Sequence, residues 1–261
     1  MSRTGLADTL HQRGRILSLF VDDARTKRAV VDELDVSRST VDRAVRDLEA
    51  HGLLERTDDG YVATVPGRVS ATVHDRYESA VADVDAAASL LAVLDNDVDV
   101  DERMLVGATT MRATAPTQSA QLDCLQECIA ASDRHLGMSA ADSGTGFDEF
   151  FHEQVVHEGL DLEFVFTEAM AAHLRESMPD RWRDMAEHGF EAYTLPDLPY
   201  GIAVCEHDDE EVATAALVVY DEQSRLAGIL FNDAPEAVAW ARETYENHRS
   251  RATPLAFDDR R

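Results

Sequence analysis

The sequence predicts an α+β protein in three parts: a small helical N-terminal unit that ends in a hairpin, a connecting helix, and a larger C-terminal α/β domain built on a mixed sheet. Three observations predict this order. The charge changes sharply along the chain, apolar residues recur at helical spacing as far as Leu94, and short apolar runs alternate with helical patterns after residue 103. We expect the domain boundaries at residues 1–68, 69–102 and 103–261.

The charge of the chain is strongly negative and uneven. Its 261 residues include 51 Asp or Glu against 24 Arg or Lys, a formal net charge of −27. Residues 1–70 hold 11 basic and 12 acidic side chains, whereas residues 71–261 hold 13 and 39, and Lys27 is the only lysine. An acidic chain that is 44% hydrophobic and almost free of lysine resembles proteins of salt-loving archaea. An ordinary acidic protein is the alternative.

Nothing in the sequence indicates export or a membrane. No apolar run reaches the roughly 18 residues that a membrane span needs, and MSRTGLADTLHQRG at the N-terminus lacks the apolar core of a signal peptide. Cys124, Cys128 and Cys205 are too few for a disulfide framework. We therefore expect a soluble, cytoplasmic protein with reduced thiols and no membrane partner.

The first 52 residues predict three helices. Apolar residues at helical spacing place a first helix over 6–20 and a second over 27–34. Ser37 is a suitable N-cap for a third helix over 38–51, and Gly52 stands where a helix commonly ends. The third helix has one face that we expect to be buried, with Val41, Ala44, Val45 and Leu48.

A hairpin follows the third helix. Two short extended runs, 53–54 and 61–62, are joined by Asp58-Asp59-Gly60, and Asp-Gly is a common hairpin turn. The predicted order is three helices, with a tight turn before the third, and then a hairpin. This is the order of a winged helix-turn-helix. Residues 5–65, above all VSRSTVDRAVRDLEAHGLLER (36–56), resemble the winged-helix domains of bacterial and archaeal transcription regulators. The resemblance implies that this unit binds DNA; a domain that only mediates protein contacts is the alternative.

Polar side chains gather on the third helix opposite its apolar face. We expect Arg43 and Arg46 to read bases, because arginine meets guanine O6 and N7 in a bidentate pair. The other candidates would position the phosphate backbone, at the helix N-terminus or on the wing: Ser37, Arg38, Ser39, Thr40 and Arg56.

The acidic remainder of the chain does not exclude DNA binding in a salt-rich cell. At about 1 M salt the Debye length is near 3 Å, so this remainder would not repel DNA at a distance.

Residues 73–94 predict one long helix. They contain no Gly or Pro, and apolar residues follow each other at intervals of four and three. The pattern is equally compatible with a short coiled coil between subunits and with a helix packed on the C-terminal domain. A dimer is expected in either case, because helix-turn-helix regulators usually read two half-sites. The heptad positions are Val73, Tyr77, Ala80, Val84, Ala87, Leu91 and Leu94.

Strands and helices alternate after an acidic loop over 95–103. Five apolar runs predict strands: MLVGAT (104–109), LDLEFVF (160–166), GIAVC (201–205), AALVVY (215–220) and LAGILF (226–231). Helical patterns occupy 118–134, 145–158, 168–177, 180–188 and 235–249. The alternation predicts a sheet with helices on both sides, and the short link DEQSR (221–225) predicts a hairpin that makes this sheet mixed.

Three segments of the C-terminal domain carry a second resemblance. They are FDEFFHEQVVHEGLDLEFVFTEAMAAHL (147–174), LPYGIAVC (198–205) and VVYDEQSRLAGILFNDAPEAVAWARETYENHR (218–249), of which FNDAPEAVAWA (231–241) is the most specific. These segments resemble the effector domain of archaeal winged-helix regulators of the methanogenesis-regulator type, similar in layout to TrmB-like sugar-responsive regulators. That domain is thought to derive from a phospholipase D-like fold, which implies a sensory module.

Catalytic and metal-binding motifs are weak. A phospholipase D-like reaction needs His-x-Lys, but Lys27 lies in the N-terminal unit. His152 and His157 of HEQVVHE are five residues apart, not the four of a zincin, and so do not share a helix face. Cys124 and Cys128 could bind a metal or act as a redox switch, although packing as small buried residues is the favoured alternative. We expect no cofactor, no metal and no enzymatic activity.

Candidate effector residues lie late in the chain. Asn232 and Asp233 follow a predicted strand and precede a helix, where ligands often bind, and with Tyr200 they are our candidates for holding a small metabolite. A helix cap ahead of Pro235 is the favoured alternative for Asn232 and Asp233. The sequence predicts a dimeric, sequence-specific DNA-binding transcription regulator modulated by a small molecule. The alternatives are a C-terminal domain that only dimerises, and a metabolite-dependent enzyme with a vestigial helix-turn-helix.

Overall fold

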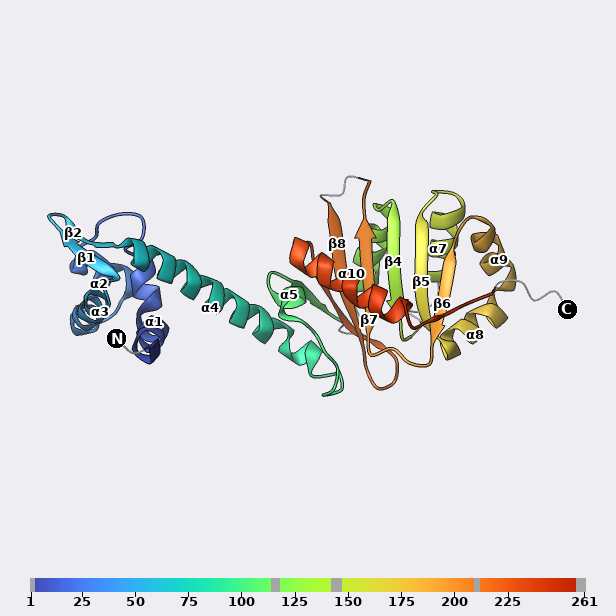
Figure 1. The fold of residues 1–261 in the computed structure, drawn as a ribbon, viewed down its shortest axis with the longest axis horizontal. Helices are drawn as coiled ribbons and strands as arrows, with labels where there is room; N and C mark the ends of the chain where they lie inside the picture. Colours follow the sequence, from blue (N-terminus) through green and yellow to red (C-terminus); the bar gives the residue numbers. More distant parts are fainter. Residues whose placement is uncertain (1–2, 114–117, 142–146, 209–211, 257–261) are drawn as a thin grey trace. The chain divides into compact units, whose positions relative to one another are not determined.

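The structure is a computed structural model of the 261-residue chain and describes residues 3–113, 118–141, 147–208 and 212–256. Contacts divide the chain into two compact units, Met1–Ala82 and Asp83–Arg261. The fold class is confirmed: helices and a hairpin form the N-terminal unit, one long helix follows, and a mixed sheet with helices forms the C-terminal unit (Figure 1). None of the described helices is long and apolar enough to cross a membrane.

Three helices and a hairpin make up the N-terminal unit. The helices are α1 (Arg3–Ser18), α2 (Lys27–Leu34) and α3 (Arg38–Ala50), and β1 (Leu54–Thr57) pairs antiparallel with β2 (Gly60–Ala63). The helix and strand order is that of a winged helix-turn-helix, as predicted. Apolar faces of the three helices enclose a core of fully buried side chains: Leu17, Phe20, Val30, Val41, Val45 and Leu48.

Backbone hydrogen bonds attach the hairpin to the segment before α2. Arg25 and Tyr61 exchange two of them, at 2.8 and 2.9 Å. Gly60, at the hairpin turn, has φ of 136°, and a Cβ atom there would lie 2.3 Å from the Arg25 carbonyl oxygen. The Asp-Gly sequence therefore does two things: it permits the turn and lets the two segments approach closely.

The long helix α4 (Val65–Leu91) begins eight residues before the first heptad position, Val73, and its two ends have different surroundings. Ala87 and Leu90 are each 1% exposed and belong to the core of the C-terminal unit. Val73 and Tyr77 are each 57% exposed. The C-terminal end of α4 thus packs on its own domain, one of the two alternatives for this helix, whereas the earlier heptad positions Val73 and Tyr77 remain uncovered.

The described residues of the C-terminal unit form one eight-stranded sheet. Its order is β10-β6-β5-β4-β7-β8-β9-β3, in which β4, β5 and β6 are parallel and every other pair is antiparallel. The strands are β3 (Thr109–Arg112), β4 (Arg134–Ser139), β5 (Asp161–Thr167), β6 (Glu191–Leu195), β7 (Gly201–Glu206), β8 (Ala213–Tyr220), β9 (Leu226–Asn232) and β10 (Thr253–Pro254).

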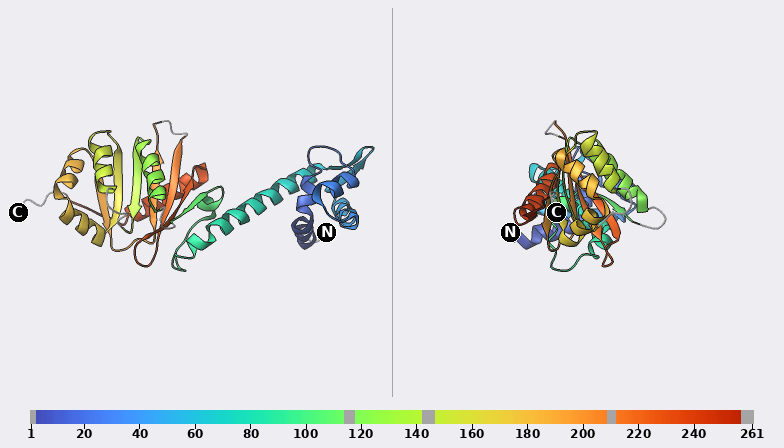
Figure 2. Two further views of the ribbon diagram at one scale, coloured as in Figure 1. Left: turned by 180° about the vertical axis from the view of Figure 1, so that it is seen from behind. Right: turned by 90° about the vertical axis from the view of Figure 1, so that its right-hand side faces the viewer.

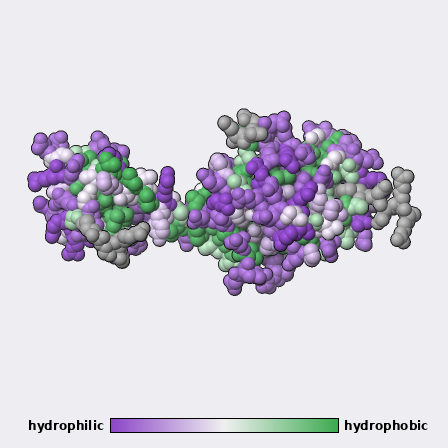
Figure 3. All heavy atoms as spheres, in the orientation of Figure 1, coloured by the Kyte–Doolittle hydropathy of each residue, from purple (hydrophilic) through white to green (hydrophobic). Residues whose placement is uncertain are grey.

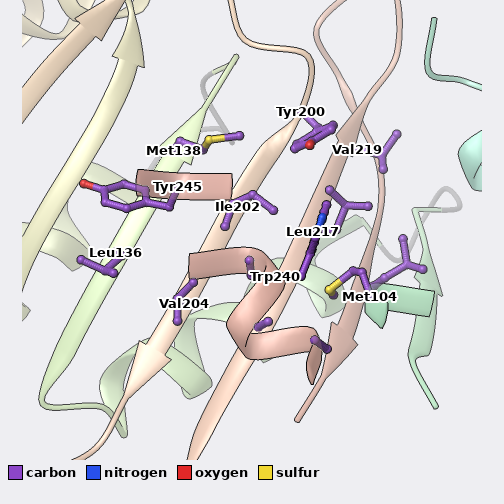
Figure 4. Close-up of a cluster of buried hydrophobic side chains, with 14 of the residues drawn as sticks. Met104, Leu136, Met138, Tyr200, Ile202, Val204, Leu217, Val219, Trp240 and Tyr245 are labelled. Atoms are coloured by element: carbon purple, nitrogen blue, oxygen red, sulfur yellow. The ribbon is translucent and has the colours of Figure 1, made fainter. Parts of the chain in front are cut away.

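Helices cover both faces of this sheet (Figures 1 and 2). One face packs against α6 (Gln118–Ala130), α7 (Phe147–Val156), α8 (Glu168–Ser177) and α9 (Pro179–Glu187). The other packs against α10 (Pro235–Arg249), the short α5 (Glu102–Leu105) and the end of α4. Figure 4 shows this second core, where Trp240 and Tyr245 of α10 lie over apolar side chains of the sheet. Polar and charged side chains cover most of the visible surface (Figure 3).

Several predicted elements of the C-terminal unit need correction. The run MLVGAT (104–109) is not a strand: its first two residues end the short helix α5, which Asp101 caps by accepting a hydrogen bond from the Arg103 amide at 2.8 Å. The strand β3 begins only at the last residue of this run, Thr109. The predicted helix over 118–134 ends at Ala130, and β4, β6 and β10 were not predicted. Residues 134–139, RHLGMS, are poor in β-branched residues, and β4 forms because the sheet closes around it on both sides.

Candidate nucleic-acid interface

Helix α3 presents one polar face to solvent. Val41, Ala44, Val45 and Leu48 are fully buried, as predicted. Ser39, Arg43 and Arg46 are exposed and follow each other at intervals of four and three, so they lie on one side of the helix. Within the part of the chain that the structure describes, the guanidinium groups of Arg43 and Arg46 have no ion pair or hydrogen bond. Both are available to an external anion.

The acidic residue next to Arg43 is neutralised from another helix. Asp42 Oδ1 lies 3.0 Å from Lys27 Nζ of α2, and the same ammonium lies 5.2 Å from the centre of the Tyr61 ring on the wing. The hydrogen bond from Lys27 lowers the pKa of Asp42 below its ordinary 3.8. The only lysine of the chain therefore ties α2, α3 and β2 together and is a closer partner of Asp42 than Arg38 of α3, whose Nε lies 4.0 Å from Asp42 Oδ2.

A second cation acts on α3 in the same way. Arg13 of α1 donates from Nε to Asp47 Oδ2 at 3.3 Å. The sequence pattern did not indicate the partners of Asp42 and Asp47. One signal could have found them: both carboxylates lie beside the apolar stripe of α3, within reach of the neighbouring helices while still partly exposed to solvent.

We expect the Asp42–Lys27 pair to appear in the pH dependence of stability. A carboxyl group whose pKa is lowered in the folded state stabilises that state above its unfolded pKa, and this contribution is lost as the pH falls below it. In circular dichroism melts, Asp42→Asn should lower the Tm at neutral pH, and the gap to the wild type should close below about pH 4. Asp59→Asn, which removes an equal charge from the wing tip, is the control. A pH-independent gap, or the same gap in both variants, would contradict the role of the pair.

The start of α3 is held by a hydroxyl cluster. Ser37 is the N-cap, as predicted, and its Oγ accepts a hydrogen bond from the Thr40 amide at 3.2 Å. The same oxygen lies 2.9 Å from Ser39 Oγ and 2.8 Å from Thr40 Oγ1. Arg38 is almost fully exposed, with Nε 4.0 Å from Asp42. Ser37 and Thr40 thus organise the helix terminus, while Ser39 and Arg38 point to solvent.

The wing offers little positive charge. Arg56 is exposed on β1, opposite Tyr61 in the register. It is the only basic residue between Leu54 and Ala63, and the tip of the hairpin carries the exposed Asp58 and Asp59. Any contact of the wing with phosphate therefore depends on Arg56, and the tip itself disfavours a close approach.

The three candidate effector residues differ in burial and in hydrogen bonding. The buried Tyr200 donates from its hydroxyl to the Asp99 carbonyl at 3.1 Å, and burial raises its pKa to about 12. Asn232 is buried and Asp233 is exposed. The predicted cap at Asp233 is wrong, because α10 has Ala234 as its N-cap and no side-chain cap.

Asn232 has a structural task of its own. Its Nδ2 donates to the carbonyls of Met104 at 3.2 Å and Val106 at 2.8 Å, and its Oδ1 accepts from the Ala234 amide at 2.9 Å. The side chain thus joins α5 to the loop that leads into α10. These contacts occupy the atoms that an effector would use, although binding by Tyr200, Asn232 and Asp233 stays a prediction.

The two histidines of the weak metal motif lie close together, with ring centres 6.1 Å apart, but have different carboxylate partners. His152 Nε2 lies 2.8 Å from Asp184 Oδ2, whereas His157 Nε2 lies 3.9 Å from Glu153 Oε2. Among the described residues, no group of three His, Cys, Asp or Glu side chains is arranged to hold a metal ion. Cys124 and Cys128 are half-buried free thiols that pack against the α6–α9 core, and burial raises the pKa of Cys128.

Comparisons with solved structures give remote likenesses. The archaeal chromatin protein TrmBL2 has 13% identity over 94% of each chain, with a TM-score of 0.44. HmgR of Pseudomonas aeruginosa has 16% identity over 94% of this chain and 96% of its own, with a TM-score of 0.25. An IclR transcriptional regulator of Alicyclobacillus acidocaldarius has 13% identity over 96% and 98%, with a TM-score of 0.22. At these scores the likenesses carry no argument. A search among curated proteins found no match.

Family models match both units of the chain. The model of the HVO_A0261 N-terminal domain matches residues 4–89. The model described as methanogenesis regulatory protein FilR1, middle domain, matches residues 120–251, just over half of the chain. This second match confirms the resemblance that segments 147–174, 198–205 and 218–249 carry. The chain belongs to the FilR1 middle-domain family.

Proposed function

We propose that this protein is a sequence-specific DNA-binding transcription regulator, with α3 as its recognition helix in the major groove. One observation carries the proposal: among the described residues Arg43 and Arg46 have no ion pair or hydrogen bond on the exposed face of α3, while cations from α1 and α2 pair with Asp47 and Asp42. The helix therefore offers two unpaired guanidinium groups to DNA in a chain of net charge −27. Arginine is the side chain best suited to guanine in that groove.

We propose a division of labour among the remaining residues of the interface. Arg38 and Ser39 would meet phosphates beside the N-terminus of α3, where the helix dipole favours negative charge. Ser37 and Thr40 would act through the hydroxyl cluster that fixes this terminus. Arg56 would contact the backbone from the wing.

We also propose that the protein acts as a homodimer through the uncovered part of α4. Five large apolar side chains repeat every fourth residue along it and are exposed by about half or more: Val65, Val69, Val73, Tyr77 and Val81. A continuous apolar row of this length on a single helix is typical of a helix–helix interface. Two copies joined in this way would present two α3 helices to two half-sites.

The C-terminal unit would supply the regulation. Its family is named after a regulatory protein, and its fold has a buried sheet with helices on both faces. We propose that a small molecule bound there changes the spacing or orientation of the two recognition helices. The charge and the near-absence of lysine support a cytoplasm rich in salt as the working environment.

Chromatin immunoprecipitation of the tagged protein in its own cells tests the proposed function. Discrete peaks that share a repeated half-site, and that disappear with Arg43→Ala/Arg46→Ala at equal protein abundance, are the expected result. Tagged Arg15→Ala, an exposed arginine of α1, is the matched control and should keep the peaks. Peaks unchanged in the double variant, or no peaks with the wild type in any growth condition, would overturn the regulator proposal.

A further inference from the structure

The C-terminal unit contains a cavity of about 230 Å³ on the sheet face that carries α6–α9. Its walls come from the sheet and from all four helices, and aromatic rings dominate its interior: Phe151, Phe164, Phe166, Trp182 and Phe190. These rings are each less than a tenth exposed. The cavity therefore reaches into the core of this unit, although some of its lining residues, such as His173 and Ser177, are exposed.

The size of the cavity limits what it can hold. A cavity of about 150 Å³ lined by apolar side chains takes up benzene, and pockets for drug-sized ligands begin at about 300 Å³. The observed volume lies between these two values and fits one aromatic ring with a short substituent. Protein cores are normally packed without such space, and an unfilled apolar cavity destabilises the fold. A bound molecule would remove that cost.

Polar groups occur at two places in the wall. Inside, Ser139 Oγ and the Tyr220 hydroxyl lie 2.8 Å apart, and the fully buried His135 is neutral because burial lowers its pKa to about 3. At the helix side, the exposed His173 and Ser177 of α8 stand near Arg181 of α9, which marks the mouth. The wall of the cavity is therefore largely apolar, with a few polar groups from the sheet and from α8 and α9.

The charge of the wall is unlike that of the whole protein. Among the described residues that line the cavity there is no Asp or Glu, although the chain has 51 of them. Among these described lining residues, Arg181 alone carries a permanent charge, and its side chain is 40% exposed at the mouth. One of its partners, Glu149 Oε1 of α7, is 3.6 Å away, and the Glu149 side chain is 76% exposed. Exposed ion pairs of this kind are weak, so a ligand carboxylate can compete with Glu149 for the guanidinium group.

We propose that this cavity binds a small aromatic monocarboxylate, with the ring among the phenylalanines and the carboxylate on Arg181. A single guanidinium group matches the planar carboxylate through two parallel hydrogen bonds. A dianion such as a phosphate ester would need more than one cation in so acidic a protein. Binding of this ligand needs only the C-terminal unit, whereas the role of the ligand as an effector of DNA binding rests on the proposed function.

Fluorescence titration of the full-length protein tests the site directly. Of the two tryptophans, Trp182 lines the cavity and Trp240 lies on the other sheet face, so Trp240→Phe leaves a reporter inside the site. Benzoate and toluene should change the emission of Trp182 and raise the Tm, because each fills the ring site. Acetate, which has the charge without the ring, should do neither. Failure of both benzoate and toluene to bind at millimolar concentration would overturn the cavity as a ligand site.

Variants of α9 test the role of the charge. Arg181→Gln should weaken benzoate binding on the order of tenfold and leave toluene binding unchanged, because only the carboxylate loses a charged partner. Arg183→Gln is the matched control: Arg183 lies on the same helix, pairs with Asp180 and does not line the cavity. Equal binding of benzoate to the wild type and to Arg181→Gln would overturn the carboxylate assignment. None of these readouts involves DNA. The ligand site can therefore be disproved while the DNA-binding proposal stands, and the DNA-binding proposal can be disproved while the ligand site stands.

Discussion

Alanine in place of both Arg43 and Arg46 is expected to reduce operator affinity at least about thirtyfold at fixed salt. Loss of a bidentate arginine–guanine contact costs about 1 to 3 kcal/mol, so two such contacts together are worth about 2 to 6 kcal/mol. The structure gives no internal partner to either guanidinium group among the described residues, so removing them breaks no ion pair of the fold. Both side chains are exposed, and the Tm should stay within a few degrees of the wild type.

Fluorescence anisotropy with a labelled operator fragment, taken from the immunoprecipitation peaks, measures this effect. Arg15→Ala changes the charge of the same unit by one on the exposed side of α1 and should change affinity little. The single variants separate two kinds of contact. An arginine that reads a base should lose discrimination against a mutated operator, whereas one that meets phosphate should weaken all sequences alike and lower the salt slope by about one. An unchanged affinity in the double variant would exclude α3 as the recognition helix.

The N-terminal unit was predictable because its signals are local. The spacing of Val41, Ala44, Val45 and Leu48, the cap at Ser37 and the glycine at position 60 each act within a few residues, and the structure shows all of them in the predicted roles. The strand β4 lacks such a signal. Its residues 134–139 contain a glycine and a histidine, and the strand exists because β5 and β7 pair with it from segments far along the chain.

The ion pairs of the candidate interface were not predictable for the same reason as β4: they depend on residues far apart in the sequence. Sequence pattern places Arg43 and Arg46 on the exposed face of α3, but it does not show that Lys27 and Arg13 pair with the acidic residues on either side of them, Asp42 and Asp47. Those pairs join residues that are 15 and 34 positions apart, and only the packing of α1 and α2 on α3 brings them together. The cavity was beyond prediction for a similar reason. Trp182, Phe151 and Phe166 lie on three different elements, and nothing local marks a space between them.

Two glutamates on the uncovered row of α4 are expected to separate the proposed dimer. In Val73→Glu/Tyr77→Glu, charges would face each other across the helix pair, where burying an unpaired carboxylate is strongly unfavourable. Sedimentation should show the mass of one chain, 28.8 kDa, in place of two. Operator affinity should fall on the order of a hundredfold, because two linked recognition helices bind far more tightly than one.

The charge change itself needs a control, since the protein is already acidic. Ser79→Glu/Ala82→Glu adds the same two charges to α4 at exposed positions outside the apolar row. A dimer in this control and a monomer in the first variant would assign the interface to the row, since helix, charge and chain are otherwise the same. If both variants keep the mass and the operator affinity of the wild type, the apolar row of α4 does not join the subunits. Two copies would then have to associate through the C-terminal unit, into whose core the end of α4 packs.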